Sequence, residues 1–367
     1  MGLKAGIIGM PNVGKSTLFN AITLSNVEAA NYPFATIEPN SGVVEVMDKR
    51  IDNMVPLYNP KKVIRATLEF VDIAGLVKGA SKGEGLGNKF LANIRETDAI
   101  CHVVRCFQNN EILHVEGNVD SLRDVEIINL ELIFSDLEVV EKRIEKIAKK
   151  AMTTKDKEAV FEHETLLKLK NALIEGKNVR SVTLNDKELE LIKGFNLLSL
   201  KPVIYVANLN ESEVSNPTVN EQYNSLLEYA RNENSLVIPT CAQIEADLAG
   251  LEEEEKIEFL KELGIEESGL DKLTKAMYSL LGLETYFTAG SDEVRAWTFK
   301  TGMKAPECAG IIHSDFQKGF IKAEVYSYED IMEYKSELKV KEHGKLRMEG
   351  KEYVVKDGDI MFFKFNV

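Results

Sequence analysis

Residues 9–17, Gly-Met-Pro-Asn-Val-Gly-Lys-Ser-Thr, constrain the fold more than any other stretch of the chain. They match Gly-x-x-x-x-Gly-Lys-Ser/Thr, a phosphate-binding loop that joins a strand to a helix. An apolar run at 5–8 precedes the loop, and a helix-like run at 17–22 follows it. In this context the loop amides and the helix N-terminus point at one anion. The sequence therefore predicts an α/β nucleotide-binding domain.

Two side chains of this loop suit phosphate chemistry. The Lys15 ammonium would stabilise negative charge on the β- and γ-phosphates, and the Ser16 hydroxyl would bind Mg²⁺. We therefore predict Lys15 as a catalytic residue and Ser16 as a metal ligand. The residues of the loop that we expect to bind the nucleotide are Asn12, Val13, Gly14, Lys15, Ser16 and Thr17.

Two further segments would complete a magnesium and γ-phosphate site. Thr36 lies in the proline-containing loop 31–40, about twenty residues beyond the phosphate loop, where switch proteins bring a threonine to the metal. Asp72 follows an apolar strand predicted at 66–71 and begins the pattern Asp-x-x-Gly, which ends at Gly75. We expect Thr36 to bind Mg²⁺ directly, Asp72 to bind it through a water, and the Gly75 amide to sense the γ-phosphate.

The residue after Gly75 determines how water can be activated. Ras-like enzymes carry a glutamine there, which orients the attacking water. This chain has Leu76, whose side chain forms no hydrogen bond, so either hydrolysis is very slow or another group positions the water. His114, on the polar loop 107–120, is the candidate catalytic residue, and an ordinary surface histidine is the alternative interpretation.

The stretch Asn208-Leu209-Asn210-Glu211 follows an apolar strand and is predicted to face the base. A guanine-specific site has Asn-Lys-x-Asp here, and its aspartate accepts two hydrogen bonds from guanine. In this chain Leu209 replaces the lysine and the longer Glu211 replaces the aspartate, so the carboxylate does not lie where guanine needs it. We therefore expect Asn208, Leu209 and Glu211 to contact the base, and adenine to be favoured over guanine.

Outside these segments the pattern changes twice. Apolar residues at alternating spacings of three and four, from Leu130 to Ala151 and again from Leu166 to Leu173, predict an antiparallel helical hairpin. Its exposed faces are either simply solvated or form a docking arm. The last segment is predicted to be a small mixed α/β module with strands at 294–299, 319–326, 353–355 and 360–365.

Composition limits the partners. The net charge of −14 means that nucleic-acid binding would need a local basic patch. The last segment, 284–367, is nearly balanced, with 13 Lys and Arg against 15 Asp and Glu. The sequence contains no signal-peptide pattern and no membrane-spanning apolar run, so we expect a cytoplasmic protein without membrane contact. The four cysteines lack metal-site spacing and are predicted to be buried structural residues.

Five segments together resemble the Obg-like ATPases of the YchF type, over essentially the full chain; they lie at 9–17, 31–40, 72–80, 208–211 and 295–310. The resemblance implies an α/β P-loop NTPase domain with a Ras-like, mostly parallel sheet, formed by 1–127 and 195–283. It also implies an inserted antiparallel coiled-coil hairpin at 128–194 and a C-terminal β-grasp-like TGS domain at 284–367.

The same resemblance implies a slow, Mg²⁺-dependent ATPase switch that prefers ATP to GTP and associates with the ribosome, on its large subunit. RNA contact would run through the hairpin and the TGS domain. The resemblance gives His114 the task of the missing glutamine, and Asn12 matches switch proteins that bind K⁺ beside the phosphates. Family members often carry cysteine where this chain has Ala35, so a redox role of that segment is not implied.

Two alternative functions stay open on the sequence. One is a GTP-specific switch GTPase. The other is a ribosome- or RNA-docking module whose nucleotide site only sets the conformation.

Overall fold

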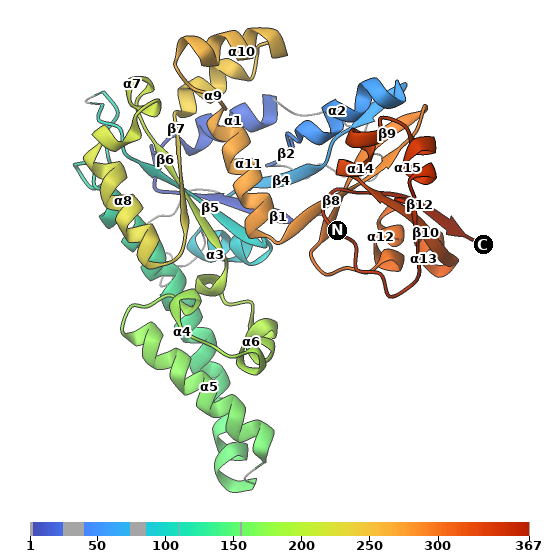
Figure 1. Ribbon diagram of the computed structural model, residues 1–367. Coiled ribbons are helices and arrows are strands. Elements are labelled where there is room, and N and C mark those ends of the chain that lie inside the picture. Colours follow the sequence, from blue (N-terminus) through green and yellow to red (C-terminus); the bar gives the residue numbers. More distant parts are fainter. Residues whose placement is uncertain (1–2, 25–39, 74–85, 110, 155, 367) are drawn as a thin grey trace. The chain divides into compact units, whose positions relative to one another are not determined.

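The computed structural model describes residues 3–24, 40–73, 86–109, 111–154 and 156–366 (Figure 1). Thr36, Gly75 and Leu76 lie outside these ranges. The described chain divides into two compact units: unit 1 comprises 3–24, 40–42 and 69–273, and unit 2 comprises 43–68 and 274–366. Among the described residues, no helix combines the length and the apolar character needed to cross a membrane.

Unit 1 contains most of a six-stranded sheet with the strand order β2-β4-β1-β5-β6-β7; only 43–45 of β2 and 67–68 of β4 are assigned to unit 2. The strands are β1 (Lys4–Ile8), β2 (Ser41–Glu45), β4 (Thr67–Asp72), β5 (Ala99–Arg105), β6 (Val203–Asn208) and β7 (Leu236–Thr240). From β4 to β7 all neighbouring strands pair in parallel. Because the carboxyl ends of parallel strands lie at one edge, the segments after β1, β4, β5, β6 and β7 gather there. The predicted α/β P-loop architecture is confirmed.

Helices and short 3₁₀ turns lie between these strands, and further helices follow β7. The helices outside the hairpin are α1 (Lys15–Leu24), α3 (Leu86–Arg95), α6 (Asp186–Ile192), α7 (Glu211–Val214), α8 (Glu221–Asn232), α9 (Ala242–Leu248), α10 (Glu253–Glu262) and α11 (Gly269–Leu280). The 3₁₀ turns are η2 (Val179–Ser181), η3 (Lys193–Phe195), η4 (Leu198–Leu200) and η5 (Pro217–Val219). All four cysteines are buried, as the sequence predicted.

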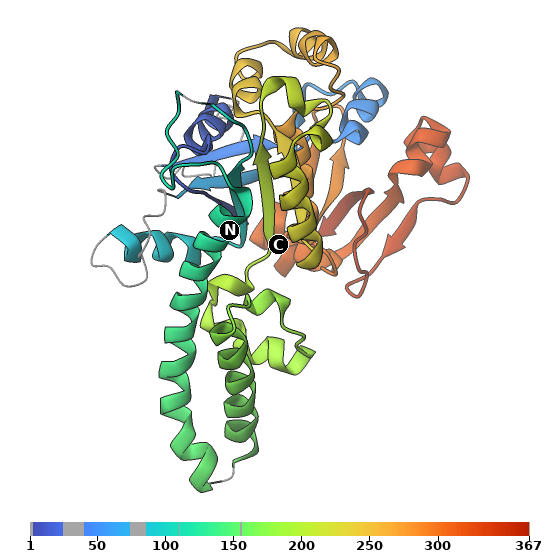
Figure 2. The same cartoon turned by 90° about the vertical axis from the view of Figure 1, so that its left-hand side faces the viewer.

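The predicted helical hairpin consists of α4 (Ser121–Thr154) and α5 (Lys157–Ile174). Both views show the two helices side by side, extending away from the sheet of their own unit (Figures 1 and 2). Their core includes Ile133, Val140 and Leu169, and the ion pair between Lys170 and Glu141, at 2.9 Å, joins their outer faces.

The hairpin differs from expectation at its base. The first helix begins at Ser121, before the predicted boundary of the insertion at 128, and Ser121 binds Gln222 of α8 through both its amide and its hydroxyl. Leu130, predicted to open the apolar seam, is exposed. Nearby, Val125, Ile128 and Leu132 are buried instead, so the first turns of α4 bury a different face from the one that forms the seam further along.

Unit 2 contains a mixed sheet with the order β11-β10-β12-β8-β9-β3. Its strands are β3 (Lys62–Ile64), β8 (Leu283–Ala289), β9 (Glu293–Lys300), β10 (Phe320–Ser327), β11 (Arg347–Glu349) and β12 (Asp359–Phe365). Its helices are α2 (Lys49–Tyr58), α12 (Ala305–Ile312), α13 (Ser314–Lys318), α14 (Tyr328–Tyr334) and α15 (Glu337–Glu342). The strand predicted at 353–355 is wrong. Val354 forms only an isolated bridge with Lys304, and the Tyr353 hydroxyl is held by Asp359 at 2.7 Å.

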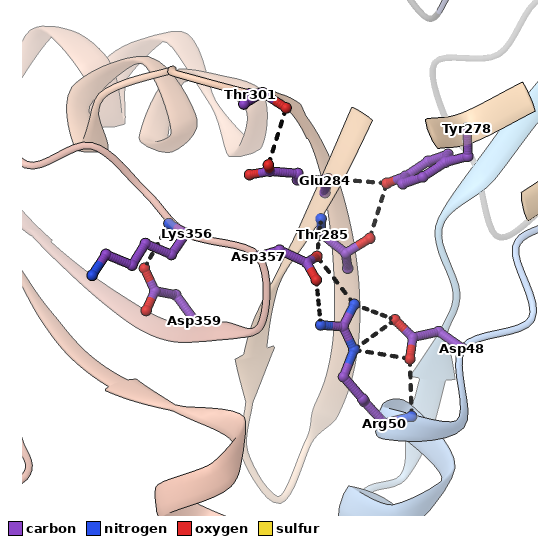
Figure 3. Close-up of polar contacts among 9 residues, drawn as sticks. All are labelled: Asp48, Arg50, Tyr278, Glu284, Thr285, Thr301, Lys356, Asp357 and Asp359. Carbon is purple, nitrogen blue, oxygen red and sulfur yellow. Dashed lines mark hydrogen bonds and ion pairs between the residues drawn. The ribbon is translucent and has the colours of Figure 1, made fainter. Parts of the chain in front are cut away.

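Residues 43–68 belong to unit 2, although the expected nucleotide domain, 1–127, includes them. Strand β3 pairs in parallel with β9, and α2 packs in the same apolar core as Phe287, Ile331 and Ile360. Figure 3 shows the Arg50 guanidinium between two carboxylates, Asp48 on its own segment and Asp357 on the C-terminal segment. This pairing is invisible to local sequence patterns, because it joins residues 307 positions apart.

Candidate nucleotide-binding site

A cavity of about 990 Å³ lies where the carboxyl ends of the parallel strands meet. Its described lining consists of Met10, Pro11, Asn12, Gly14, Lys15, Ser16, Thr17, Asp72, Phe107, Asn109, Ile112, Asn208, Leu209, Asn210, Glu211, Cys241, Ala242 and Gln243. Residues far apart in the sequence, predicted separately for phosphate and base binding, are thus brought to one site.

Close packing fixes the shape of the phosphate loop. Gly14 has φ +95°, and a Cβ on it would lie 2.1 Å from the Asn208 Nδ2 atom. A Cβ on Gly9 would lie 2.7 Å from the Val103 carbonyl oxygen. Only glycine therefore fits at these two motif positions. The loop then enters α1 through a hydrogen bond of 3.0 Å from the Leu18 amide to the Gly14 carbonyl.

Lys15 and Asp72 meet at the wall of the cavity as an ion pair. Lys15 is buried in the first turn of α1, where the positive end of the helix dipole adds to its charge. Ser16 is exposed on the same turn and lines the cavity. The Ser16 hydroxyl and the Asp72 carboxylate are hard oxygen donors of the kind Mg²⁺ prefers, so this pair fits the predicted metal.

The buried side chain of Asn208 links the end of β6 to the phosphate loop and to the segment after β7. Its Nδ2 donates to the Val13 carbonyl at 2.8 Å, and its Oδ1 accepts from the Ala242 amide at 2.9 Å. Both polar groups of the side chain are therefore used within the protein, and the side chain holds the phosphate loop against the segment after β7. This geometry departs from the expected base contact, although Asn208 does line the cavity.

Leu209 and Glu211 reach the same cavity. Leu209 is buried, and its amide donates to the Thr240 carbonyl at 2.8 Å. Glu211 is exposed at the start of α7. The segment after β7, Cys241 to Gln243, adds a second wall.

His114 has a different environment from either predicted one. It is buried rather than exposed, and the cavity wall, as far as the structure describes it, does not include it. The Glu116 amide donates to Nδ1 at 3.1 Å, which leaves the proton on Nε2, and Nε2 donates to Asp124 at 2.7 Å. Burial raises the pKa of Asp124, and its hydrogen bonds with His114 and Arg123 partly offset this rise.

The loop that carries His114 nevertheless reaches the phosphate loop. The Asn12 side chain donates to the Leu113 carbonyl at 3.2 Å. Asn12 itself has φ +63°, a conformation that asparagine tolerates better than most residues. The residue next to His114 is therefore held by the phosphate loop, while the imidazole is held by α4.

Sequence reasoning missed the residue that organises this loop. Arg105, at the end of β5, is 1% exposed and donates to the carbonyls of Phe107, Asn109 and Ile112 at 3.0–3.2 Å. Its guanidinium lies 4.4 Å from the centre of the Phe107 ring. The sequence does contain a sign of this role, because Arg105 ends a mostly apolar strand and is therefore expected to be buried. A buried cation must find several hydrogen-bond acceptors, which makes it an organiser of the loop around it.

Two protein-family models match the chain. One, described as "50S ribosome-binding GTPase", matches residues 4–135. The other, the YchF-GTPase C-terminal model, is described as a "Protein of unknown function" and matches residues 283–366.

Curated relatives match from end to end. The proteins titled "Ribosome-binding ATPase YchF" from Bacillus subtilis and Haemophilus influenzae are 60% and 54% identical over 367 residues, with 100% of each chain covered. A solved structure, "Structure of the Schizosaccharomyces pombe YchF GTPase", is similar with a TM-score of 0.89 and 42% identity, covering 99% of this chain and 98% of that one. With its phosphate loop, its cavity and its two-unit fold, the chain belongs to the YchF family.

Proposed function

We propose that this chain binds Mg·ATP in the cavity at the phosphate loop and hydrolyses it slowly, as a switch that associates with the ribosome. The observation that carries the proposal is the convergence of Lys15, Ser16 and Asp72 on one cavity with Leu209 and Glu211. The relatives' title of ribosome-binding ATPase supports both parts of the proposal.

The phosphates would bind to the backbone amides of residues 12–17 and to the Lys15 ammonium. On nucleotide binding, this ammonium would give up its ion pair with Asp72 and contact phosphate oxygens instead. Ser16 and Thr36 would hold Mg²⁺ directly, and Asp72 would hold it through a water. When bound, this ion neutralises charge on the β- and γ-phosphates. Gly75 would donate its amide to the γ-phosphate. Catalysis would thus consist mainly of positioning and charge stabilisation.

Adenine is the proposed base. The cavity wall includes the apolar side chains of Leu209, Phe107 and Ile112, and the longer Glu211 stands at the position of the guanine-reading aspartate. A site that leaves guanine's polar edge unpaired loses affinity for it. The relatives' titles differ on this point, since the curated bacterial proteins are called ATPases and the fission yeast structure is called a GTPase.

His114 is the proposed water-positioning group. In the described conformation its imidazole is bound to Asp124 and the Glu116 amide, so its action on water requires this hydrogen bond to open. That requirement, together with Leu76, accounts for slow turnover.

We also propose that K⁺ binds beside the phosphates with Asn12 as a ligand, so replacing K⁺ with Na⁺ should lower turnover.

The proposed partner is the large ribosomal subunit, in the cytoplasm, and the hairpin is the proposed RNA contact. Between positions 146 and 157, around the turn of the hairpin, the sequence has five lysines and one aspartate. This local patch satisfies the condition set by the acidic chain, because phosphate binding needs only a local excess of cations. The C-terminal unit is the second proposed contact surface.

The direct test compares ATP and GTP affinities of the purified protein by titration with fluorescent analogues. Tighter ATP binding is expected, and tighter GTP binding would favour the GTPase alternative. Lys15→Ala should retain the fold and lose hydrolysis. If its turnover equals that of the wild type, the nucleotide would only set the conformation, as in the docking-module alternative.

A further inference from the structure

Unit 2 contains a second hollow, of about 960 Å³, which is nearly as large as the nucleotide cavity. All of its described lining residues come from 288–365, within the C-terminal segment. They stand on β8, β9 and the turn between them, on α12, α13 and α15, on strands β10, β11 and β12, and on the loop before β11. The proposed nucleotide cycle does not use this hollow.

The hollow exposes large apolar side chains close together. Leu338 on α15, Phe362 on β12 and Met348 on β11 are 66%, 59% and 55% exposed. All three line the hollow, as does Phe365, which stacks on Phe316 with ring centres 3.8 Å apart. Scattered apolar residues are normal on a protein surface, but a contiguous group in a concavity marks a binding site.

Charged groups around the hollow favour one kind of occupant. The lining includes four carboxylates, Asp292, Glu293, Glu324 and Glu337, and two ammonium groups, Lys341 and Lys364. Lys364 lies 3.7 Å from Glu324 and 4.1 Å from the centre of the Phe362 ring, so one of the two cations already has partners within the hollow. Of the four carboxylates, Asp292 is paired with Lys61 at 2.7 Å and Glu324 with Lys364 at 3.7 Å, so the charge argument rests on Glu293 and Glu337. These two carboxylates repel phosphates and attract cationic side chains.

We propose that this hollow is a docking groove for a basic protein segment, an amphipathic helix with apolar anchors flanked by Lys and Arg. Apolar side chains at positions i, i+3 or i+4, and i+7 would enter between Leu338, Phe362 and Met348, as in other helix-in-groove complexes. The basic side chains would lie near Glu293 and Glu337. The proposal concerns unit 2 alone, and it stands whether or not the nucleotide site hydrolyses ATP.

Residues that line the groove also form hydrogen bonds and strand pairs that lead to the segment between the two predicted switch loops. Glu337 accepts a hydrogen bond of 2.7 Å from the Tyr326 hydroxyl, which is bonded in turn to the Tyr58 hydroxyl of α2 at 2.8 Å. Glu293 is the register partner of Lys62 in β3. An occupant of the groove would therefore contact residues that are directly bonded to 43–68.

Trp297 makes the groove directly measurable. It is the single tryptophan of the chain, and it lines the groove. We would titrate the full chain with a synthetic amphipathic helix of Leu and Lys and follow the Trp297 emission. The comparison ligands are the same peptide with Glu in place of Lys, a scrambled Leu–Lys peptide, and oligouridine RNA.

The Leu–Lys helix is expected to change the Trp297 emission in a saturable way, and the Glu peptide is not. Leu338→Ala combined with Phe362→Ala should weaken binding about tenfold or more, as expected when central anchors are truncated. Both side chains are exposed, so these variants should fold. Ile321→Ala is the matched control, because Ile321 is an exposed apolar residue of β10 that does not line the groove.

Three results would overturn the proposal. One is no saturable emission change with the Leu–Lys helix. Another is equal binding of the Lys, Glu and scrambled peptides, which would remove the argument from charge and spacing. The third is tighter binding of oligouridine with loss of affinity in the double variant, which would make the groove a nucleic-acid site. Nucleotide hydrolysis measured on the same samples separates this outcome from a failure of the proposed ATPase activity.

Discussion

The imidazole of His114 is held between the Glu116 amide and Asp124, at 3.1 and 2.7 Å, one residue away from a contact with the phosphate loop. The imidazole is thus carried by a loop that contacts the phosphate loop, but in this conformation its hydrogen bonds keep it from acting on water. The sequence could identify the histidine and its loop. It could not reveal the carboxylate, because Asp124 lies ten positions away on α4.

His114→Ala is expected to lower ATP turnover about 100-fold, at the lower end of the effect expected for loss of a proton-handling or water-orienting group. Nucleotide affinity should be nearly unchanged, because the side chain does not line the described cavity wall. Single-turnover hydrolysis and ATP titration measure the two quantities separately. His163→Ala, on the hairpin, is the control. Unaltered turnover in His114→Ala would remove the catalytic role.

Glu245 is a buried carboxylate that fixes the start of α11. It accepts from the Gly269 amide at 2.7 Å and from the Leu270 amide at 3.2 Å. Burial raises the pKa of Glu245 to about 7, and the two amides only partly offset this effect. The folded state therefore binds more protons than the unfolded state between about pH 4.5 and pH 7, so this group's contribution to stability falls as pH rises through that window.

Glu245→Gln removes this titration. The stability of the wild type relative to the variant should therefore fall by about 3 kcal/mol between pH 4.5 and pH 7.5, from a pKa shift of two to three units. Urea unfolding followed by circular dichroism at several pH values measures the difference. A difference that does not vary with pH would mean that Glu245 has an ordinary pKa.

Among the elements, α2 and β3 were the hardest to place from the sequence. Their residues follow local rules: Asp48 caps α2 by accepting from the Arg50 amide, and β3 is a three-residue strand that contains the β-branched residues Val63 and Ile64. Their partners, however, are strands and loops more than 200 residues later. Strand and helix patterns specify which element forms, whereas register and partner depend on the whole core.

By contrast, the strand ends at Asp72 and Asn208 were predictable, because parallel strands share one carboxyl edge.

Arg50→Ala is expected to destabilise unit 2 by about 1–2 kcal/mol. Arg50 bonds Asp357 through two nitrogen atoms at 2.7 and 3.1 Å, a charge-assisted arrangement. Asp357 is partly exposed, so solvent weakens the pair. Urea unfolding followed by the emission of Trp297, which lies in unit 2, measures the effect.

Lys61→Ala is the control for this prediction. The ion pair of Lys61 with Asp292 is exposed on both sides, and it should contribute almost nothing. An equal loss of stability in both variants would contradict the role assigned to Arg50.

At the scale of the whole molecule, the boundary between the units follows the core rather than the sequence. The predicted division kept 1–127 together, but 43–68 clusters with the C-terminal residues. That segment runs between the two stretches where the predicted switch residues Thr36 and Gly75 lie. Unit 2 is therefore joined through the chain to both predicted switch loops, which suits a protein whose partner binding depends on its nucleotide.

A buried polar network is a further feature that the sequence did not reveal. Glu233, the C-cap residue of α8, accepts from Arg180, Tyr205 and Asn178 at 2.8–3.0 Å, next to the base of the hairpin. Its members are scattered over 55 positions and follow no motif. Motifs identify chemistry because few residue sets can perform it, whereas many different residue sets can brace two elements. The nucleotide site was therefore more predictable than the packing that supports it.

Nucleotide-dependent association with the ribosome can be measured by co-sedimentation. The purified chain would be centrifuged with ribosomes in ATP, in ADP and in a non-hydrolysable ATP analogue, with Lys15→Ala as the variant impaired at the phosphates. We expect most of the protein to sediment with ribosomes in the analogue and little in ADP. Equal sedimentation in all three nucleotides, or none in any of them, would contradict this expectation.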